Sequence, residues 1–422
     1  MKVAIVAEYY PRAGDPVLGI WAHRQAVAVR DLGAEVRVLV LYRPLPPLSA
    51  ARALEIGKLV GAARQPARAV IDGIYVQYVR YVSPPRPWSY GSWGLWAAPS
   101  LALALRRLRR EFAFELVHAH NAVPAGDAVR RAAPHVPLVV SVHGGDVYAT
   151  SAGTAGAHAV RTTLAHARVV LANSAGTARR CAEHGALTTR VVHLGATVPP
   201  AGTAAPPAGT PAPPAGAAAP PAGTAAGAAP PHPAPPTLVT VGHLIPRKRH
   251  ADVIAALARL RERHPDLRYV IVGDGPEREP LRALAASLGV ADRVELRGQL
   301  APEQAAACGR VATVFVLPSV DEAFGVAYVE AMAGGVPAIG CRGEDGPEEI
   351  AAAGGGILLV PSGDIDALAA QIELLLNDPG RRAALGREAA ATVRRAFTWE
   401  RCGTDTMAAY AEAGTGIRPS WK

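Results

Sequence analysis

Short hydrophobic runs alternate with helix-like stretches along most of the chain. In its first part the runs occupy residues 2–7, 36–41, 74–82, 116–119, 138–142 and 169–172, and a helix-like stretch at 22–32 ends at Gly33. Short apolar runs are typical of buried strands, and strands that alternate with helices form a parallel sheet covered by helices. The first part of the chain therefore predicts a Rossmann-like α/β domain.

The same pattern restarts in the second part of the chain. It predicts helices at 252–263, 280–288 and 326–333, and strands at 238–241, 269–272, 294–296, 314–317 and 337–340. A second Rossmann-like α/β domain is therefore expected. Two such domains should face each other across a cleft at the carboxyl ends of their sheets, where ligands of this architecture bind.

The segment between the two patterns has a different composition. Residues 199–236 are almost entirely Pro, Ala, Gly and Thr, with a recurring Pro-Pro-Ala-Gly unit, and cannot build a core. They predict a disordered linker or insertion. The expected organisation is thus a first domain at 1–198, a second at 237–397, and a C-terminal helix at 398–422 that packs back toward the first domain.

Composition narrows the class of protein. The chain has 422 residues, of which 50% are hydrophobic and 19% charged, so it is not a wholly disordered protein. The net charge of +9 is a modest excess over this length and indicates a solvated surface rather than a nucleic-acid partner. Four scattered cysteines and an N-terminus without a secretion signal favour a cytoplasmic location.

One segment suggests contact with a membrane. Trp88, Trp93 and Trp96 lie around the start of an apolar stretch at 94–105, and a basic cluster follows it: Arg106, Arg107, Arg109 and Arg110. The stretch is too short to span a bilayer. It fits peripheral docking on an anionic membrane surface, which would place the protein at the inner face of the cell membrane. A buried helix with a basic end fits it equally well.

The most informative chemistry lies between residues 318 and 337. A strand ends at Pro318, a loop presents Glu322, and a helix begins near Gly325. Backbone amides at a helix start attract phosphate oxygens, and a glycine allows close approach of a ligand, so Gly325 and its neighbours Phe324 and Val326 are candidate donor-binding residues. Further along the helix, a carboxylate can bind both hydroxyls of a diol such as ribose.

The carboxylate in that position is Glu330, with seven residues between it and Glu322. The pair resembles the Glu-x7-Glu motif of glycosyltransferase family 4. Other segments are also similar to that family, namely Val117–His120, Ser141–Asp146, Val241–Lys248, Gly273–Pro276 and Trp399–Glu400. The resemblance extends over most of the chain outside the Pro-rich segment.

The resemblance implies a GT-B fold and a retaining glycosyltransferase that works without a metal or other cofactor. The C-terminal domain would bind a nucleotide sugar, and the N-terminal domain would bind a hydroxyl acceptor such as a glycan, a glycolipid or a small molecule. By matching position, Glu330 would hold the donor ribose, Glu322 would contact the transferred sugar, and Lys248 would contact the phosphates. Retention would proceed by front-face substitution, so Glu322 is not expected to act as a covalent nucleophile.

Without a metal, cations and backbone amides must stabilise the charge that builds on the leaving diphosphate. Arg247 and Lys248 follow the first strand of the second domain. Many family members carry an arginine soon after the strand glycine, where this chain has His243. The second contact to the diphosphate is therefore left to either His243 or Arg247.

Three residues of the first domain are candidates for the reacting and acceptor side. His143 follows a strand and matches a family histidine that contacts the sugar near the reacting carbon, so we expect a catalytic role. His120 ends a neighbouring strand and is a candidate acceptor residue. Gly19 lies in the first loop between strand and helix and matches a glycine-containing loop of the family near the acceptor.

Alternative functions remain at this stage. A sugar-nucleotide epimerase and a noncatalytic nucleotide-sugar or carbohydrate-binding protein fit the same architecture. A Rossmann oxidoreductase fits less well, because the first loop lacks Gly-x-Gly-x-x-Gly spacing. Asp364-Ile365-Asp366 resembles a metal-binding Asp-x-Asp pair, but its position before an apolar helix favours a helix N-cap. The nucleotide base, the sugar and the acceptor stay open.

Overall fold

The structure is a computed structural model that describes residues 1–44, 65–149, 154–199 and 235–414. The chain divides into two compact units. Unit 1 comprises Met1–Gly195 and Phe397–Lys422, and unit 2 comprises Ala196–Ala396. Most of the expected Pro-rich linker, residues 200–234, lies outside the described residues.

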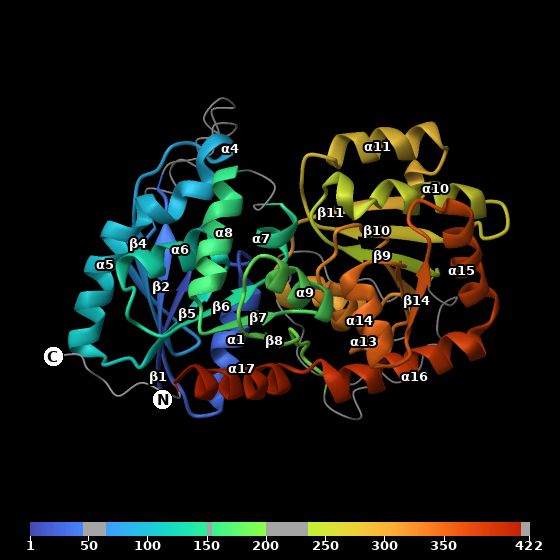
Figure 1. Cartoon of the computed structure of the whole chain (residues 1–422). Coiled ribbons are helices and arrows are strands. Elements are labelled where there is room, and N and C mark those ends of the chain that lie inside the picture. Colours follow the sequence, from blue (N-terminus) through green and yellow to red (C-terminus); the bar gives the residue numbers. More distant parts are fainter. Residues whose placement is uncertain (45–64, 150–153, 200–234, 415–422) are drawn as a thin grey trace, which may run out of the picture. The chain divides into compact units, whose positions relative to one another are not determined.

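Unit 1 contains an eight-stranded sheet in the order β3-β4-β2-β1-β5-β6-β7-β8 (Figure 1). The strands are β1 Lys2–Ala7, β2 Glu35–Tyr42, β3 Arg68–Ile71, β4 Ile74–Arg80, β5 Leu116–His120, β6 Leu138–Val142, β7 Val169–Ala172 and β8 Thr189–Val191. All neighbours pair in parallel except β3, which is antiparallel to β4. The predicted parallel sheet is confirmed, β4 among its strands, and the antiparallel edge strand β3 is an addition to it.

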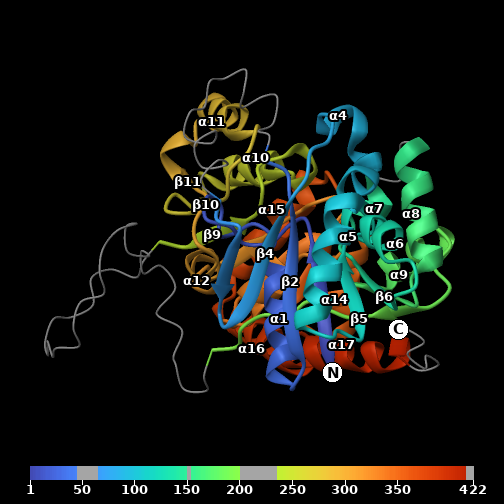
Figure 2. The same ribbon diagram turned by 90° about the vertical axis from the view of Figure 1, so that its left-hand side faces the viewer.

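Helices cover both faces of this sheet (Figures 1 and 2). They are α1 Ile20–Asp31, α4 Arg86–Ser89, α5 Trp93–Glu111, α6 Asp127–Ala132, α7 Gly145–Tyr148, α8 Thr154–His166, α9 Ala175–Glu183 and α17 Trp399–Gly414. One apolar cluster joins α5, α6 and α8 to the sheet, and a second joins α1 and α17 to the other face. The chain's last described helix, α17, thus completes unit 1 by packing on α1.

Unit 2 contains a six-stranded parallel sheet in the order β11-β10-β9-β12-β13-β14. Its strands are β9 Thr237–Val241, β10 Arg268–Val272, β11 Val294–Gly298, β12 Val314–Val316, β13 Ala338–Cys341 and β14 Ile357–Val360. Its α-helices are α10 His250–Leu260, α11 Arg278–Ser287, α12 Pro302–Arg310, α13 Val326–Met332, α14 Asp345–Ala353, α15 Ile365–Asn377 and α16 Pro379–Ala396. A core of α10, α11 and α15 covers one face, and α12 and α13 pack together elsewhere in the unit. The second predicted α/β domain is confirmed.

Helix α5 settles part of the membrane question. Trp93 is only 5% exposed, and its indole N–H donates to the Pro84 carbonyl at 3.2 Å and to Ser89 Oγ at 3.0 Å, so its predicted place at a membrane interface is wrong. Trp96, by contrast, is 47% exposed. The helix is buried along one side and open along the other, so each earlier interpretation describes one side of it. Across the described ranges, no helix is long and apolar enough to cross a bilayer.

Candidate functional site

The predicted donor-side residues of unit 2 gather at one edge of its sheet. Strand β9 lies between β10 and β12, so the chain order reverses there. The loops that leave the carboxyl ends of β9 and β12 carry residues 242–249 and 317–325. A reversal point of this kind opens a crevice in which parallel α/β sheets bind ligands.

Lys248 and Glu322 form an ion pair at this edge. The Lys248 ammonium donates a hydrogen bond to Glu322 Oε2, which also accepts one from Ser319 Oγ at 2.8 Å. Glu322 is only 7% exposed. Burial by itself raises the pKa of its carboxyl, but the charges of Lys248 and Arg247 and the Ser319 hydrogen bond outweigh burial and hold the pKa below its usual value. Glu322 is therefore ionised at neutral pH.

The loop that carries Glu322 is held from two sides. The Val320 amide donates to the Arg247 carbonyl at 2.8 Å, and Arg247 Nη1 donates to the Asp321 carbonyl at 3.2 Å. On the other side, the Glu322 amide donates to Glu344 Oε2 at 3.0 Å. Arg247 therefore braces the loop, whatever contact it makes with a donor.

Glu344 is the site residue that sequence reasoning missed. It stands at the N-cap of α14, and burial is the largest of the effects that raise the pKa of its carboxyl. The next turn adds a bond from the Gly346 amide to the Glu322 carbonyl at 2.8 Å. In the sequence, Glu344 is recognisable only as an acidic residue just before a helix. Such residues are too common for this feature to mark a site.

Gly325 forms the turn between this loop and α13. Its φ is +83°, and a Cβ there would lie 2.5 Å from the Tyr328 ring. Helix α13 begins at Val326, as predicted, but has only seven residues, so its dipole adds little and a nearby cation matters more. The Phe324 side chain is 1% exposed, which leaves only its main chain for contact with a ligand.

The two remaining donor-side candidates are at least partly open to solvent. Glu330 is half-buried and lies one turn beyond Val326 on α13. The residue His243 is exposed, and its carbonyl accepts a hydrogen bond from His250 Nε2 at 3.4 Å. Hydrogen bonds thus join Lys248 and Arg247 to Glu322 or to its loop, whereas no hydrogen bond or ion pair joins His243 to them in the described residues.

In unit 1 the structure brings His120 and His143 together. His120 Nδ1 and His143 Nε2 lie 3.1 Å apart, and the rings are stacked with an interplanar angle of 5°. Burial lowers the pKa of His120, and it lowers the pKa of His143 to about 4, so both rings are neutral at neutral pH. Because His120 is 1% exposed, it reaches a ligand only through His143.

Gly19 is explained by packing. It is the N-cap of α1 with a φ of +65°, and a Cβ there would lie 2.1 Å from the Tyr9 carbonyl carbon. No other residue fits between α1 and the end of β1 without a backbone shift. The structure thus requires this glycine for the fold, and its predicted contact with the acceptor stays a prediction.

Asp364 is a helix cap, as predicted. Its Oδ1 accepts a hydrogen bond from the Ala367 amide at 2.8 Å at the start of α15. Asp366 pairs instead with Arg259 at 2.9 Å. Within the described ranges, no group of three or more His, Cys, Asp or Glu side chains is arranged to hold a metal ion.

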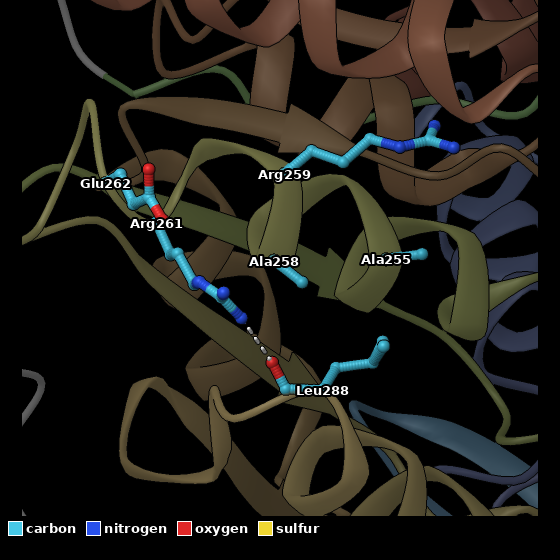
Figure 3. Close-up of a pocket in the computed structure, with 6 residues that line it drawn as sticks. All are labelled: Ala255, Ala258, Arg259, Arg261, Glu262 and Leu288. Carbon is cyan, nitrogen blue, oxygen red and sulfur yellow. Dashed lines mark hydrogen bonds between the residues drawn. The ribbon is translucent and has the colours of Figure 1, made fainter.

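A pocket of about 390 Å³ lies elsewhere in unit 2, between the outer side of α10 and the end of α11 (Figure 3). Arg261 Nη1 donates across it to the Leu288 carbonyl at 3.1 Å. It is lined by Ala255, Ala258, Arg259, Arg261, Glu262 and Leu288. None of the predicted site residues contributes to it, so the pocket and the predicted site are separate features.

Comparison with known proteins matches a glycosyltransferase family model to each of the two units. Residues 18–197 match the family model described as Glycosyltransferase Family 4, and residues 228–392 match the model described as Glycosyl transferases group 1. The chain is 37% identical over 158 residues to the GDP-mannose-dependent alpha-(1-6)-phosphatidylinositol monomannoside mannosyltransferase of Mycolicibacterium smegmatis. The aligned residues cover 36% of this chain and 41% of that protein. It is 35% identical over 181 residues to the D-inositol 3-phosphate glycosyltransferase of Corynebacterium efficiens, with 42% of each chain covered. The matches therefore span less than half the length of these curated relatives.

Solved structures resemble the chain over nearly its whole length. Sucrose-phosphate synthase from Thermosynechococcus elongatus superposes with a TM-score of 0.73 at 20% identity, covering 98% of both chains. Anabaena Alr3699/HepE in complex with UDP and glucose gives a TM-score of 0.64 at 18% identity, covering 97% of this chain and 99% of that chain. These likenesses confirm the predicted GT-B fold.

Proposed function

Because the chain belongs to glycosyltransferase family 4, we propose that it moves a sugar from a nucleoside-diphosphate sugar to a hydroxyl acceptor, with retention at the anomeric carbon and without a bound metal. The observation that carries the proposal is the ion pair of Lys248 and Glu322 beside Gly325. A half-buried cation and a buried acid at the reversal point of the sheet supply one group for a diphosphate and one for a sugar.

The chemistry follows from charge. As the glycosidic bond breaks, negative charge builds on the leaving diphosphate, and a preorganised cation stabilises that state more than the ground state. Lys248 is held in place by Glu322, so little reorganisation is needed when the phosphates arrive. The leaving phosphate oxygen accepts the proton of the acceptor hydroxyl on the same face of the sugar, which gives retention without a protein nucleophile.

The other donor-side residues take supporting roles in this proposal. Glu330 binds the ribose hydroxyls, and the amides of Gly325 and Val326 bind phosphate oxygens. Phe324 contributes its main chain alone, because its ring is buried. In unit 1, His143 contacts the sugar near the reacting carbon.

The relatives suggest which donor to test first. The Mycolicibacterium smegmatis relative is named as GDP-mannose-dependent, and one structural neighbour was solved with UDP-glucose. We propose GDP-mannose as the first donor, with UDP-glucose as the comparison. A ligand that binds only the native state raises the melting temperature by mass action.

The test is a thermal-shift screen followed by a transfer assay. We expect one of the two donors to stabilise the protein and Glu330→Gln to weaken that binding about tenfold, because a neutral amide replaces an ionised acceptor of hydrogen bonds. Glu279→Gln on α11 is the matched control, since Glu279 is exposed and pairs only with Arg282 in the described contacts. Conversion of the donor to an epimer without release of nucleoside diphosphate would contradict the proposal.

We also propose that the open side of α5 docks on an anionic membrane surface. The exposed apolar residues of this side include Leu95, Trp96 and Leu103, which are 52%, 47% and 50% exposed. One to three turns further along the helix, the side chains of Arg106, Arg107 and Arg110 are also exposed. Exposed apolar side chains combined with arginines suit the boundary between acyl chains and anionic headgroups.

Cosedimentation with vesicles tests this surface. The full-length protein should bind vesicles that contain phosphatidylglycerol and should be released by salt. Trp96→Ser combined with Arg107→Glu should reduce binding about tenfold, since each basic residue contributes roughly 1 kcal/mol near an anionic surface. Binding that is equal for neutral and anionic vesicles, or unchanged in the double variant, would contradict this surface assignment.

A further inference from the structure

An arginine is held between aromatic rings at the carboxyl edge of the unit 1 sheet. The Arg86 guanidinium lies 4.1 Å from the centroid of the Tyr90 ring and 5.7 Å from that of Tyr9. It also donates a hydrogen bond to the Tyr9 hydroxyl. Tyr9 is the second residue after β1, so Arg86 lies at the edge where parallel α/β sheets bind ligands.

Most of the hydrogen-bonding capacity of Arg86 is not used by the described residues. A guanidinium carries five N–H donors, and the Tyr9 hydroxyl accepts from one of them. Arg86 is exposed, and no carboxylate forms an ion pair with it in the part of the chain that the structure describes. An arginine that stacks on an aromatic ring still presents its N–H edge to a carboxylate or a phosphate.

The acid beside this arginine has another partner. Glu8 Oε2 accepts a hydrogen bond from the Tyr90 hydroxyl at 2.7 Å. Burial raises the pKa of the Glu8 carboxyl above its usual value, although the charge of Arg86 acts against burial. Glu8 therefore attracts Arg86 from a distance, and the guanidinium edge stays available to an anion from solution.

Two further arginines add positive charge to this part of the edge. Arg43 directly follows β2 and lies 5.3 Å from the centroid of the Trp93 ring, and Arg86 lies 6.0 Å from the same centroid. Arg12, in the loop after β1, acts electrostatically on Glu8 together with Arg86. The edge of unit 1 thus has a part with arginines as well as the part with the two neutral histidines.

Aromatic contacts connect the two parts. The ring centroids of Tyr9 and Trp21 lie 6.4 Å apart, and those of Trp21 and His143 lie 6.0 Å apart. Tyr9 and Trp21 are both half-buried. A ligand that lies along these two rings has one end near His143 and the other end near Arg86.

We propose that Arg86 binds an anionic group of the acceptor, a phosphate or a carboxylate, at a subsite that the rings of Tyr9 and Tyr90 hold in place. That the anion belongs to the acceptor rests on the proposed glycosyl transfer, whereas anion binding by Arg86 does not. Bonds from a guanidinium to an anion are charge-assisted and bidentate, so Arg86 selects anionic acceptors over neutral ones.

Anion binding can be measured without donor or acceptor. In the full-length protein labelled with ¹⁵N-arginine, the Nε–H signal of Arg86 is the one lost in Arg86→Gln. We expect inorganic phosphate and acetate, each titrated at constant ionic strength, to shift this signal until it saturates. The signal of Arg161, an exposed arginine of α8, is the control and should not move.

The two anions distinguish the two ligand classes, since the one that binds more tightly identifies the group as a phosphate or a carboxylate. A signal of Arg86 that moves with neither anion, or that moves equally with chloride, overturns the subsite.

Variants of Tyr90 test how the guanidinium is held. Tyr90→Phe keeps the ring and loses the hydroxyl, so the affinity for phosphate should stay within about twofold of wild type. Tyr90→Leu removes the ring, and the affinity should fall about threefold, as for loss of an exposed cation–π contact. Equal affinities of Tyr90→Leu and wild type overturn the role of the ring.

Kinetics assign the anion to the acceptor. Arg86→Gln should raise the KM for the acceptor about tenfold and leave kcat and the KM for the donor within about twofold of wild type. Arg86→Lys keeps the charge but loses the bidentate geometry, so the KM for the acceptor should rise about threefold. Arg161→Gln is the matched control and should change none of these constants.

A rise in the KM for the donor in place of the acceptor, or an unchanged KM for both in Arg86→Gln, overturns the inference. Absence of transfer in the wild type overturns the proposed function and leaves the result of the anion titration standing.

Discussion

The two units place opposite kinds of chemistry at the carboxyl edges of their sheets. Unit 2 presents an ion pair of the half-buried Lys248 with the buried Glu322, in which each charge is compensated by its partner. Unit 1 presents two neutral histidines and an indole whose hydrogen-bonding capacity is not fully used. A paired charge is ready to be shared with a diphosphate, and neutral donors suit hydroxyl oxygens. Under the proposed function, each edge serves a different part of the reaction.

The largest effect should come from breaking the ion pair. Lys248→Ala removes the cation proposed for the diphosphate, so kcat should fall by about 10²–10³-fold, as for loss of one preorganised donor. It also leaves the Glu322 carboxylate buried and unpaired, which should cost about 3–5 kcal/mol of unfolding free energy. Urea unfolding and initial rates measure the two effects.

A double variant separates activity from folding. In Lys248→Ala/Glu322→Gln the buried charge is gone, so most of the stability should return while transfer stays low. Full transfer activity in a folded Lys248→Ala or Glu322→Gln protein would show that these residues are not the proposed machinery.

The next effect concerns the neutral histidines of unit 1. The pKa of His143 is lowered to about 4 by burial, whereas an unfolded histidine titrates near pH ~6.5. Between these values the unfolded chain binds more protons than the native one, so the unfolding free energy falls as the pH falls from about 6.5 to 4. His143→Asn should remove about 3 kcal/mol of that fall.

Urea unfolding at pH 7 and pH 4.5 measures this contribution. At pH 7 the histidine is neutral in both states, so that measurement isolates the packing cost of the substitution. An identical loss of stability on acidification in wild type and His143→Asn would mean that His143 is not held neutral by burial.

A smaller effect should follow from Gly325→Ala. The residue has a positive φ, and a Cβ would meet the Tyr328 ring at 2.5 Å, so strain and steric overlap both act. The free energy of unfolding should fall by about 2–3 kcal/mol, and donor binding should weaken. Gly343→Ala is the control: its φ is +81°, but no atom lies within 4 Å of the added Cβ, so it shows the strain alone. Equal losses of unfolding free energy in the two variants would show that the close approach to the Tyr328 ring adds nothing to the effect of Gly325→Ala.

The smallest effect decides which residue makes the second contact to the diphosphate. Arg247 donates a hydrogen bond to the loop of Glu322, whereas His243 is exposed and makes no hydrogen bond or ion pair with that loop in the described residues. Arg247→Ala should raise the KM for the donor about tenfold, and His243→Ala should change it less than about twofold. The reverse order in steady-state kinetics would assign the contact to His243.

Much of the fold was predictable because its strands are fully buried. Strands β6 and β7 have the predicted bounds, because both are short, almost wholly apolar runs that are buried over their full length, as is typical of a parallel sheet covered on both faces. Strand β3 and its hairpin with the predicted strand β4 were missed, although Asp72 and Gly73 between the two strands are the signature of the turn, and both have positive φ. Strand β8 was missed because its three residues are not fully buried and form no apolar run.

The site was predictable where spacing along one helix carries it. Glu322, Gly325 and Glu330 lie on one loop and one short helix, so their order in the sequence is their order in space. The pairing of Lys248 with Glu322 joins residues 74 positions apart, and only the pairing of β9 with β12 brings them together. The same holds for Trp21 beside His143, which depends on how α1 packs in unit 1, and for Trp93, whose burial fits the buried-helix alternative and not the membrane one.

The anomeric configuration of the product tests the central claim most directly. Proton NMR of the reaction with the donor found in the thermal-shift screen, run in the presence of EDTA, reports the configuration of the new glycosidic bond and the release of nucleoside diphosphate. The account predicts a product with the configuration of the donor, formed at an unchanged rate in EDTA. An inverted product, or loss of transfer in EDTA that a divalent metal restores, would contradict it.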